Sequence, residues 1–176
     1  MTPRTSPPMP MTRVAAASTD LMVGIAAGLA AAWAMTLFQN AWMRVAAEPE
    51  PEETAASKAA DALSEQASGA PIKECNKKIA DAMLHYLTGA LIGGAYGLLG
   101  GIFPKLFAVR GLLFGAGLWV LADEIAVPAL RLGPPPTEAN PKDHALGAAA
   151  HLVFGAVLDI SRRWINSMIS PTPADL

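Results

Sequence analysis

The side chains of this sequence that could do acid–base chemistry lie inside apolar segments. His85 opens one such segment, Asp123 and Glu124 lie late in the next, and His151 lies early in the last. A carboxylate beside a histidine can relay protons, or it can orient a histidine that binds a metal ion. The same pair can also be a buried hydrogen bond that only joins two helices. All three interpretations stay open for these four residues.

A metal centre and an enzyme active site have the least support in the sequence. No His-x-x-x-His or Glu-x-x-His pair places two metal ligands on one helical face, so we expect no metal and no cofactor. The sequence contains no nucleophile–base motif and no cofactor fingerprint, so we expect no enzymatic activity. The single cysteine, Cys75, excludes an intrachain disulfide and a cysteine-rich zinc site.

The composition is that of a membrane protein. Of the 176 residues, 52% are hydrophobic and only 16% are charged, whereas charged residues make up roughly 25% of an average soluble domain. The net charge is −2 and the sequence has no basic stripe, so we expect the lipid bilayer as a partner and no nucleic acid.

Four apolar blocks are candidates to cross a membrane, the third with two charges inside it and the fourth only if it extends toward Trp164. They cover residues 21–38, 86–103, 111–130 and 145–160. About 20 helical residues cross the roughly 30 Å core of a bilayer. We therefore predict an all-α integral membrane protein, a four-helix bundle with up-down topology. Its domain covers residues 20–165, with spans at about 20–43, 80–103, 110–131 and 143–164.

The other segments are polar. We predict a disordered N-terminal tail at 1–19, an extramembrane acidic helix at 50–68 and a C-terminal tail at 166–176. The acidic helix is expected to have Pro51 in its first turn and to stop at Gly69, because proline suits a helix start and glycine a helix end. Phe103-Pro104 should end the second span, and Pro128 should kink the third.

The first apolar block has an alternative interpretation as a signal peptide, since Val45-Ala46-Ala47 offers small residues for cleavage. Its apolar run exceeds the usual core of about 7–15 residues, which favours a retained membrane span. Lysine and arginine are nearly balanced between the two sides, six against seven. We place both termini in the cytoplasm because Arg162-Arg163 lies directly against the end of a span.

An up-down topology brings the polar residues to one side of the membrane. Counted from the 131–143 loop at 1.5 Å per residue, Glu124 and His151 both lie roughly 10–12 Å deep. His85 should lie near the same end, whereas His144 should lie at the interface. Asp159 lies at the opposite end of the last span, near Arg162 or Arg163.

Glycines recur every fourth residue in three of the spans. In water each helical glycine costs about 1 kcal/mol relative to alanine, but in lipid small residues at this spacing let two helix backbones approach. The stripe packs either inside the bundle or against a second copy in a homodimer. The residues are Gly24 and Gly28, then Gly89, Gly93, Gly97 and Gly101, then Gly111 and Gly115.

The second and fourth spans share a short pattern. His85 precedes Gly89 by four residues, as His151 precedes Gly155. Together with the Gly-x-x-x-Gly pairs of the first and third spans, this pattern fits a duplicated helical hairpin. Segments rich in alanine and glycine also match by chance, and both explanations stay open.

The second half of the sequence resembles the YagU family of small bacterial inner-membrane proteins of unknown function. The likeness covers roughly residues 100–165 and consists of several short motifs. They are Phe103-Pro104-Lys105, Gly111-Leu112-Leu113 with Gly115, Pro128, Leu130 and Leu132 before Pro134-Pro135, His151-Leu152-Val153 and Arg162-Arg163. The resemblance implies a multi-pass protein of the bacterial inner membrane and carries no active site.

Two functions follow from these observations. The first is a structural or interaction component of the membrane, acting as a homodimer or with another membrane protein. The second is a small proton-coupled carrier or channel that uses His85, Asp123, Glu124 and His151.

Overall fold

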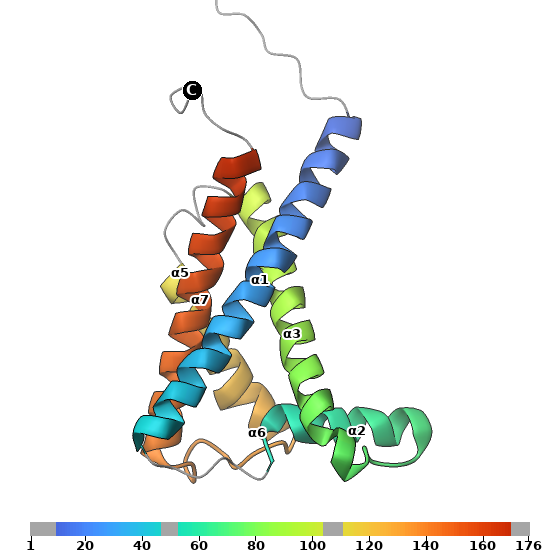
Figure 1. Cartoon of the computed structure of the whole chain (residues 1–176), viewed down its shortest axis with the longest axis vertical. Helices are drawn as coiled ribbons and strands as arrows, with labels where there is room; N and C mark the ends of the chain where they lie inside the picture. Colours follow the sequence, from blue (N-terminus) through green and yellow to red (C-terminus); the bar gives the residue numbers. More distant parts are fainter. Residues whose placement is uncertain (1–9, 47–52, 104–110, 170–176) are drawn as a thin grey trace, which may run out of the picture.

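A computed structural model describes residues 10–46, 53–103 and 111–169. The secondary structure elements within these ranges are all helices. Four helical stretches are long and apolar enough to cross a membrane. Figure 1 shows them side by side, with α2 lying transverse to them. The elements in chain order are α1 (Pro10–Ala46), α2 (Ala55–Ser68), α3 (Glu74–Ile102), α5 (Gly111–Trp119), the π-helix η1 (Val120–Ala126), α6 (Val127–Ala129) and α7 (Pro141–Ile169).

The first helix, α1, begins at Pro10, ten residues before the predicted start of the first span. Residues 11–23 contain no proline or glycine, so nothing interrupts a helix there. The hydroxyls of Ser18 and Thr19 donate hydrogen bonds to the Ala15 carbonyl at 2.9 and 3.0 Å, which leaves the helix intact. Residues 10–19 are therefore helical rather than a disordered tail, and the predicted tail at 1–9 lies outside the described residues.

The helix α2, which was predicted to lie outside the membrane, is shorter at its start than predicted. Thr54 is its N-cap, where its side-chain oxygen accepts a hydrogen bond from the Ser57 amide at 3.0 Å. The helix ends at Ser68, and its C-cap is Gly69, whose φ of 77° suits glycine. Pro51 was predicted in the first turn, but the helix begins only at Ala55, because the side chain that caps it is Thr54.

The other predicted boundaries differ by a few residues. α3 begins at Glu74 and ends at Ile102, directly before the predicted stop at Phe103-Pro104. α7 continues to Ile169, so residues 166–169 of the predicted C-terminal tail are helical. The predicted loop at 104–110 and the tail at 170–176 lie outside the described residues.

Glycine backbones join α1 to α3. Gly24 and Gly28 of α1 lie directly against the glycine stripe of α3. A Cβ atom at Gly93 would lie 2.6 Å from the Gly28 Cα atom, and one at Gly97 would lie 2.9 Å from the Gly24 Cα atom. Because α1 covers this stripe, α3 does not offer it to a second copy of the chain.

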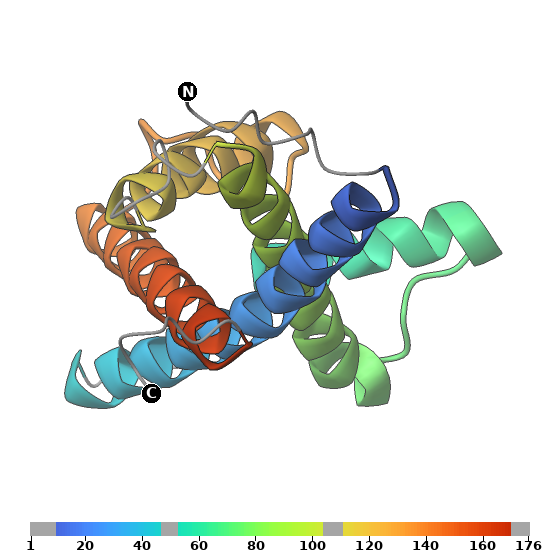
Figure 2. The ribbon, with the colours of Figure 1, turned by 90° about the horizontal axis from the view of Figure 1, so that it is seen from above.

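A second glycine seam joins α5 to α7. A Cβ atom at Gly155 of α7 would lie 2.9 Å from the Gly115 Cα atom, and Gly111 lies against the Gly155 carbonyl. Seen from above, α7 lies between α1 and α5 (Figure 2). The helices therefore form two glycine-packed pairs, α1 with α3 and α5 with α7. The two pairs meet where α1 contacts α7.

A small apolar core lies between the two pairs. The Tyr96 ring of α3 reaches the Phe114 ring of α5, with centroids 4.7 Å apart. Tyr96 and Leu158 have no exposed surface. The buried residues of this core are Ala27, Ala31, Ala32, Met35, Tyr96, Ala150, Phe154 and Leu158.

The third span changes its helical pitch before Pro128. Its middle part, η1, is a π-helix in which the Val127 amide donates to the Ala122 carbonyl, five residues earlier. Proline lacks an amide hydrogen, and its ring crowds the carbonyl four residues before it, here that of Glu124. The predicted kink is thus a widened stretch of helix that contains Asp123 and Glu124.

Candidate functional site

His85 contacts α1 and its own neighbour on α3. The His85 Nε2 atom lies 3.2 Å from the Ala32 carbonyl oxygen of α1, and its ring packs edge-on against Tyr86. This position follows from the fold, because the histidine lies on a helix whose glycine stripe is covered by α1. The described contacts of His85 are thus a contact with α1 and one within its own helix, and its membership of a polar cluster with the acidic residues stays a prediction.

Asp123 of η1 lies beside His151 of α7. The Asp123 Oδ2 atom is 3.5 Å from the His151 Nδ1 atom, and the side chains are 37% and 10% exposed. The same Nδ1 atom lies 2.9 Å from the Gly147 carbonyl oxygen. Because a carbonyl only accepts hydrogen bonds, Nδ1 of His151 carries a hydrogen. The carboxylate therefore makes a longer, second contact with a nitrogen that already donates within its own helix.

Glu124 contacts His144, a residue that the sequence places at the membrane interface. The Glu124 Oε1 atom lies 2.7 Å from the His144 Nδ1 atom. On its other side, the His144 Nε2 atom lies 2.9 Å from the Pro136 carbonyl oxygen. A signal in the sequence could have identified this residue: it precedes His151 by seven positions, two helical turns, and so shares its face of α7.

Gly147 leaves the room in which the Asp123 carboxylate lies against α7. A Cβ atom at Gly147 would lie 2.7 Å from the Asp123 Oδ2 atom and 3.3 Å from the Trp119 Nε1 atom. Among the described residues, this indole nitrogen is buried without a hydrogen-bond partner. At this end of the spans, the Asp123 carboxylate and the Trp119 indole N–H therefore lie against the side of α7 that carries His144 and His151.

A second polar group lies at the opposite end of the spans. The buried Asp159 carboxylate accepts a hydrogen bond from the Tyr96 hydroxyl at 3.1 Å. It also accepts one from the Arg163 guanidinium at 2.5 Å, in agreement with the predicted nearby arginine. The Arg162 guanidinium lies against Gly100, with its central carbon 6.0 Å from the centre of the Tyr96 ring. These contacts pair the buried charge of Asp159 and join α3 to α7.

The segment of α7 between the two polar groups is apolar. Residues 152–158 consist only of leucine, valine, phenylalanine, glycine and alanine. They span roughly 12 Å between His151 and Asp159 at 1.5 Å per residue. Phe154 and Leu158 belong to the buried core, and Gly155 to the glycine seam. The two polar groups are thus separate sites.

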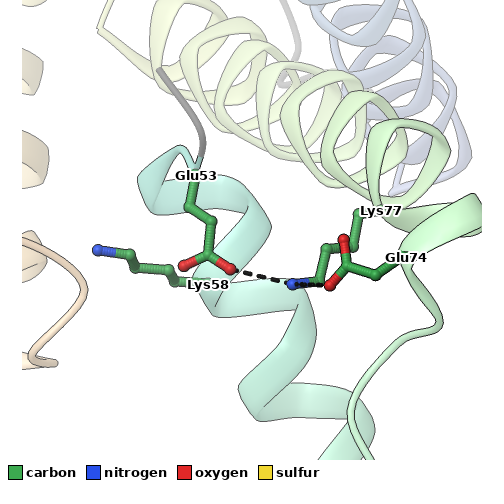
Figure 3. Close-up of a pocket in the computed structure, with 4 residues that line it drawn as sticks. All are labelled: Glu53, Lys58, Glu74 and Lys77. Atoms are coloured by element: carbon green, nitrogen blue, oxygen red, sulfur yellow. Dashed lines mark hydrogen bonds and ion pairs between the residues drawn. The ribbon is translucent and has the colours of Figure 1, made fainter.

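A third group of charges lies outside the apolar core, between α2 and α3. Figure 3 shows an open pocket lined by Glu53, Lys58, Glu74 and Lys77. The Lys77 ammonium lies 3.0 Å from Glu53, 2.8 Å from Glu74 and 3.5 Å from Asp61. Most of these acids are solvent-accessible, and exposed ion pairs of this kind contribute at most about 1 kcal/mol each. The group fastens α2 to the start of α3.

A family comparison matches more than half of the chain. The model of a family described as proteins of unknown function, DUF1440, matches residues 44–160. The chain belongs to the DUF1440 family. The matched range begins near the end of α1 and includes the acidic pair, His144 and His151. No curated protein and no solved structure matches the chain.

The residues near the acidic pair do not form a metal centre of the usual kind. Within residues 10–46, 53–103 and 111–169, no three histidine, cysteine, aspartate or glutamate side chains gather closely enough to hold a metal ion. What the arrangement offers chemically is two carboxylate–imidazole pairs, Asp123 with His151 and Glu124 with His144. Such pairs can hold, release or pass a proton.

Proposed function

We propose that this DUF1440 protein is a multi-pass protein of the bacterial inner membrane and acts there as a structural or interaction component. In this proposal the four spans form an up-down bundle in the lipid bilayer, both termini lie in the cytoplasm, and the protein is not an enzyme. The similarity of residues 100–165 to the YagU family supports the location. The two glycine seams support a rigid scaffold, because close backbone packing is what holds helices together in lipid.

The observation that carries this proposal is the apolar layer between the polar groups. A carrier or channel needs a polar route through the membrane, since an unsatisfied charge in the bilayer core is costly. Here Phe154 and Leu158 fill the region between His151 and Asp159. Asp159 is itself occupied by Tyr96 and Arg163. The contacts of both polar groups join one helix to another, as expected of a protein with a structural role.

The third span supplies the surface for an interaction. In its most apolar stretch 6% of the residues are buried, against 28% to 39% in the other three spans. Leu113 and Leu121 are 69% and 62% exposed, and a Cβ atom at Gly117, between them, would meet nothing within 4 Å. In this proposal a second copy or another membrane protein packs on this face, and lipid covers the rest.

Cysteine crosslinking in native membranes tests the interaction. A Gly117→Cys variant on a Cys75→Ser background should form a disulfide-linked product under mild oxidation, whereas a Gly69→Cys variant on α2 should not. If the product has twice the chain mass, the partner is a second copy; a product of another mass indicates a different protein. If Gly117→Cys stays uncrosslinked in every membrane preparation, no second copy packs at Gly117 and the homodimer form of the proposal fails.

The alternative function is a small proton-coupled carrier or channel, and the two carboxylate–imidazole pairs favour it. Vesicles containing the purified protein and a pH-sensitive dye distinguish it from the scaffold. The scaffold predicts no pH-driven flux in the wild type. A carrier predicts flux that Asp123→Asn, Glu124→Gln and His151→Ala reduce while the variants still fold.

A further inference from the structure

Both ring nitrogens of His144 face oxygen atoms. Nδ1 lies 2.7 Å from Oε1 of Glu124, and Nε2 lies 2.9 Å from the carbonyl oxygen of Pro136. A backbone carbonyl only accepts hydrogen bonds, so Nε2 must carry a hydrogen. A neutral imidazole has a single N–H, which leaves Nδ1 with a lone pair directed at the glutamate oxygen. Two like lone pairs at this distance repel one another.

One additional proton resolves this conflict. Placed on Nδ1, it makes His144 an imidazolium that donates to both oxygens, with Glu124 as a carboxylate. Placed on Glu124, it makes a carboxylic acid that donates to Nδ1 of a neutral His144. In both arrangements the pair holds one proton more than an ionised glutamate beside a neutral histidine.

The other two histidines of the chain do not need an additional proton. Nδ1 of His151 faces the Gly147 carbonyl, and Nε2 of His85 faces the Ala32 carbonyl. Each of these contacts is satisfied by one neutral tautomer, with the hydrogen on Nδ1 in His151 and on Nε2 in His85. Among the three histidines, His144 is therefore the one whose two ring nitrogens both face hydrogen-bond acceptors in the described contacts.

We propose that Glu124 and His144 form a proton-binding site whose bound proton fastens η1 and the 130–140 loop to the start of α7. The geometry joins three separate parts of the chain: Glu124 belongs to η1, His144 to α7, and the Pro136 carbonyl to the loop between them. The other titratable groups around the pair are Asp123 on η1 and Asp143 and His151 on α7. Asp143, next to His144 in the sequence, adds a negative charge beside the pair.

The proposal has a direction in pH. While the proton is bound, both contacts of His144 are made. As the pH rises and the proton leaves, neutral His144 can donate to Glu124 or to Pro136 but not to both. The loop or η1 then loses its hydrogen bond to His144. The side chains of His144 and Glu124 are 28% and 18% exposed, so the pair is not sealed inside the protein. This holds whether or not the protein moves protons across the membrane.

Nitrogen-15 NMR of the full chain in lipid nanodiscs tests the proposal, because imidazole nitrogen shifts distinguish the two neutral tautomers from the imidazolium. The chain has 3 histidines, which single His→Gln variants assign. The spectra are recorded from about pH 5 to about pH 8, the range in which imidazole groups titrate. Infrared spectra of the same samples show whether Glu124 is a protonated acid, by a carbonyl band that Glu124→Gln removes.

Either an imidazolium at His144 or a protonated Glu124, lost together with the loop contacts as the pH rises, supports the proposal. A neutral His144 beside an ionised Glu124 at the lowest pH overturns it. Glu124→Gln is the matched control, because its amide can donate to Nδ1 of a neutral histidine without an additional proton. In that variant we expect His144 to be a neutral Nε2–H tautomer at neutral pH. If the variant does not fold, the wild-type spectra alone still decide.

Discussion

Replacing Gly93 with alanine should destabilise the protein, although alanine is the better helix former. In this position the added methyl group would meet backbone rather than a flexible side chain. The Cβ atom would lie 2.6 Å from the Gly28 Cα atom and 2.8 Å from the Gly28 amide nitrogen. Carbon atoms pack at about 3.5–4.0 Å. The two helices must therefore move apart by about 1 Å, and backbone atoms cannot rotate away.

The expected cost follows from two opposing effects. Overpacking a tight interface costs about 1–3 kcal/mol, and we expect the upper half of this range because the whole seam must separate. Replacing a helical glycine with alanine recovers up to about 1 kcal/mol. The net result for Gly93→Ala is a loss of about 1–2 kcal/mol in the free energy of unfolding. Gly93→Leu should cost more and disrupt the fold in detergent.

Gly117→Ala is the matched control, because a Cβ atom there would meet nothing within 4 Å. It lies in a transmembrane helix like Gly93 but should be neutral or stabilising by up to about 1 kcal/mol. Unfolding by dodecyl sulfate in mixed micelles, followed by tryptophan fluorescence and circular dichroism, measures both variants. The reasoning is refuted if Gly93→Ala is as stable as the wild type, or if Gly117→Ala loses as much stability.

Three further substitutions can be measured by the same unfolding assay. Thr54→Ala removes the N-cap hydrogen bond from the Ser57 amide and the hydroxyl's own bond to the Asp81 carboxylate, and it should cost about 1–2 kcal/mol, whereas Thr54→Ser should cost little. Tyr96→Phe removes the hydroxyl that donates to buried Asp159 and should cost about 1–3 kcal/mol; an unchanged stability would show that Arg163 alone satisfies the carboxylate. Trp119→Phe removes a buried N–H without a partner and should stay within about 1 kcal/mol of wild type, whereas a larger loss would mean that the indole nitrogen is bonded.

The helices and the seams were predictable because both follow from local patterns. Block length and hydropathy indicate where spans lie, and the structure has four candidate spans at nearly the predicted positions. The stripe from Gly89 to Gly97 marks a face that can approach another backbone. The sequence leaves open which helix that is, since a second copy would serve equally well. The structure places α1 there because Gly24 and Gly28 have the complementary spacing.

The candidate site was only partly predictable, because it depends on rotation about the helix axes. A count of residues from the loop gives a common depth for Glu124 and His151, and these helices do meet. The same count cannot show which acid contacts which histidine. In the structure Glu124 contacts His144, and it is Asp123 that contacts His151. His85 has the right depth but faces α1. The depth of a residue follows from its position in the sequence, whereas the helix that its side chain faces depends on the packing of all the helices.

Pro128 explains how two neighbouring acids reach histidines that lie two turns apart. Asp123 and Glu124 follow one another in η1, where the widened helix turns accommodate the proline. With alanine at position 128 the missing amide returns and an ordinary α-helix becomes possible, which would rotate the acids by roughly one residue relative to α7. Pro128→Ala should therefore separate Glu124 from His144 and leave this histidine neutral in nitrogen-15 spectra, with the pattern of His85 unchanged. A His144 spectrum identical to that of the wild type would show that the facing helix, and not the proline, sets the register of the acidic pair.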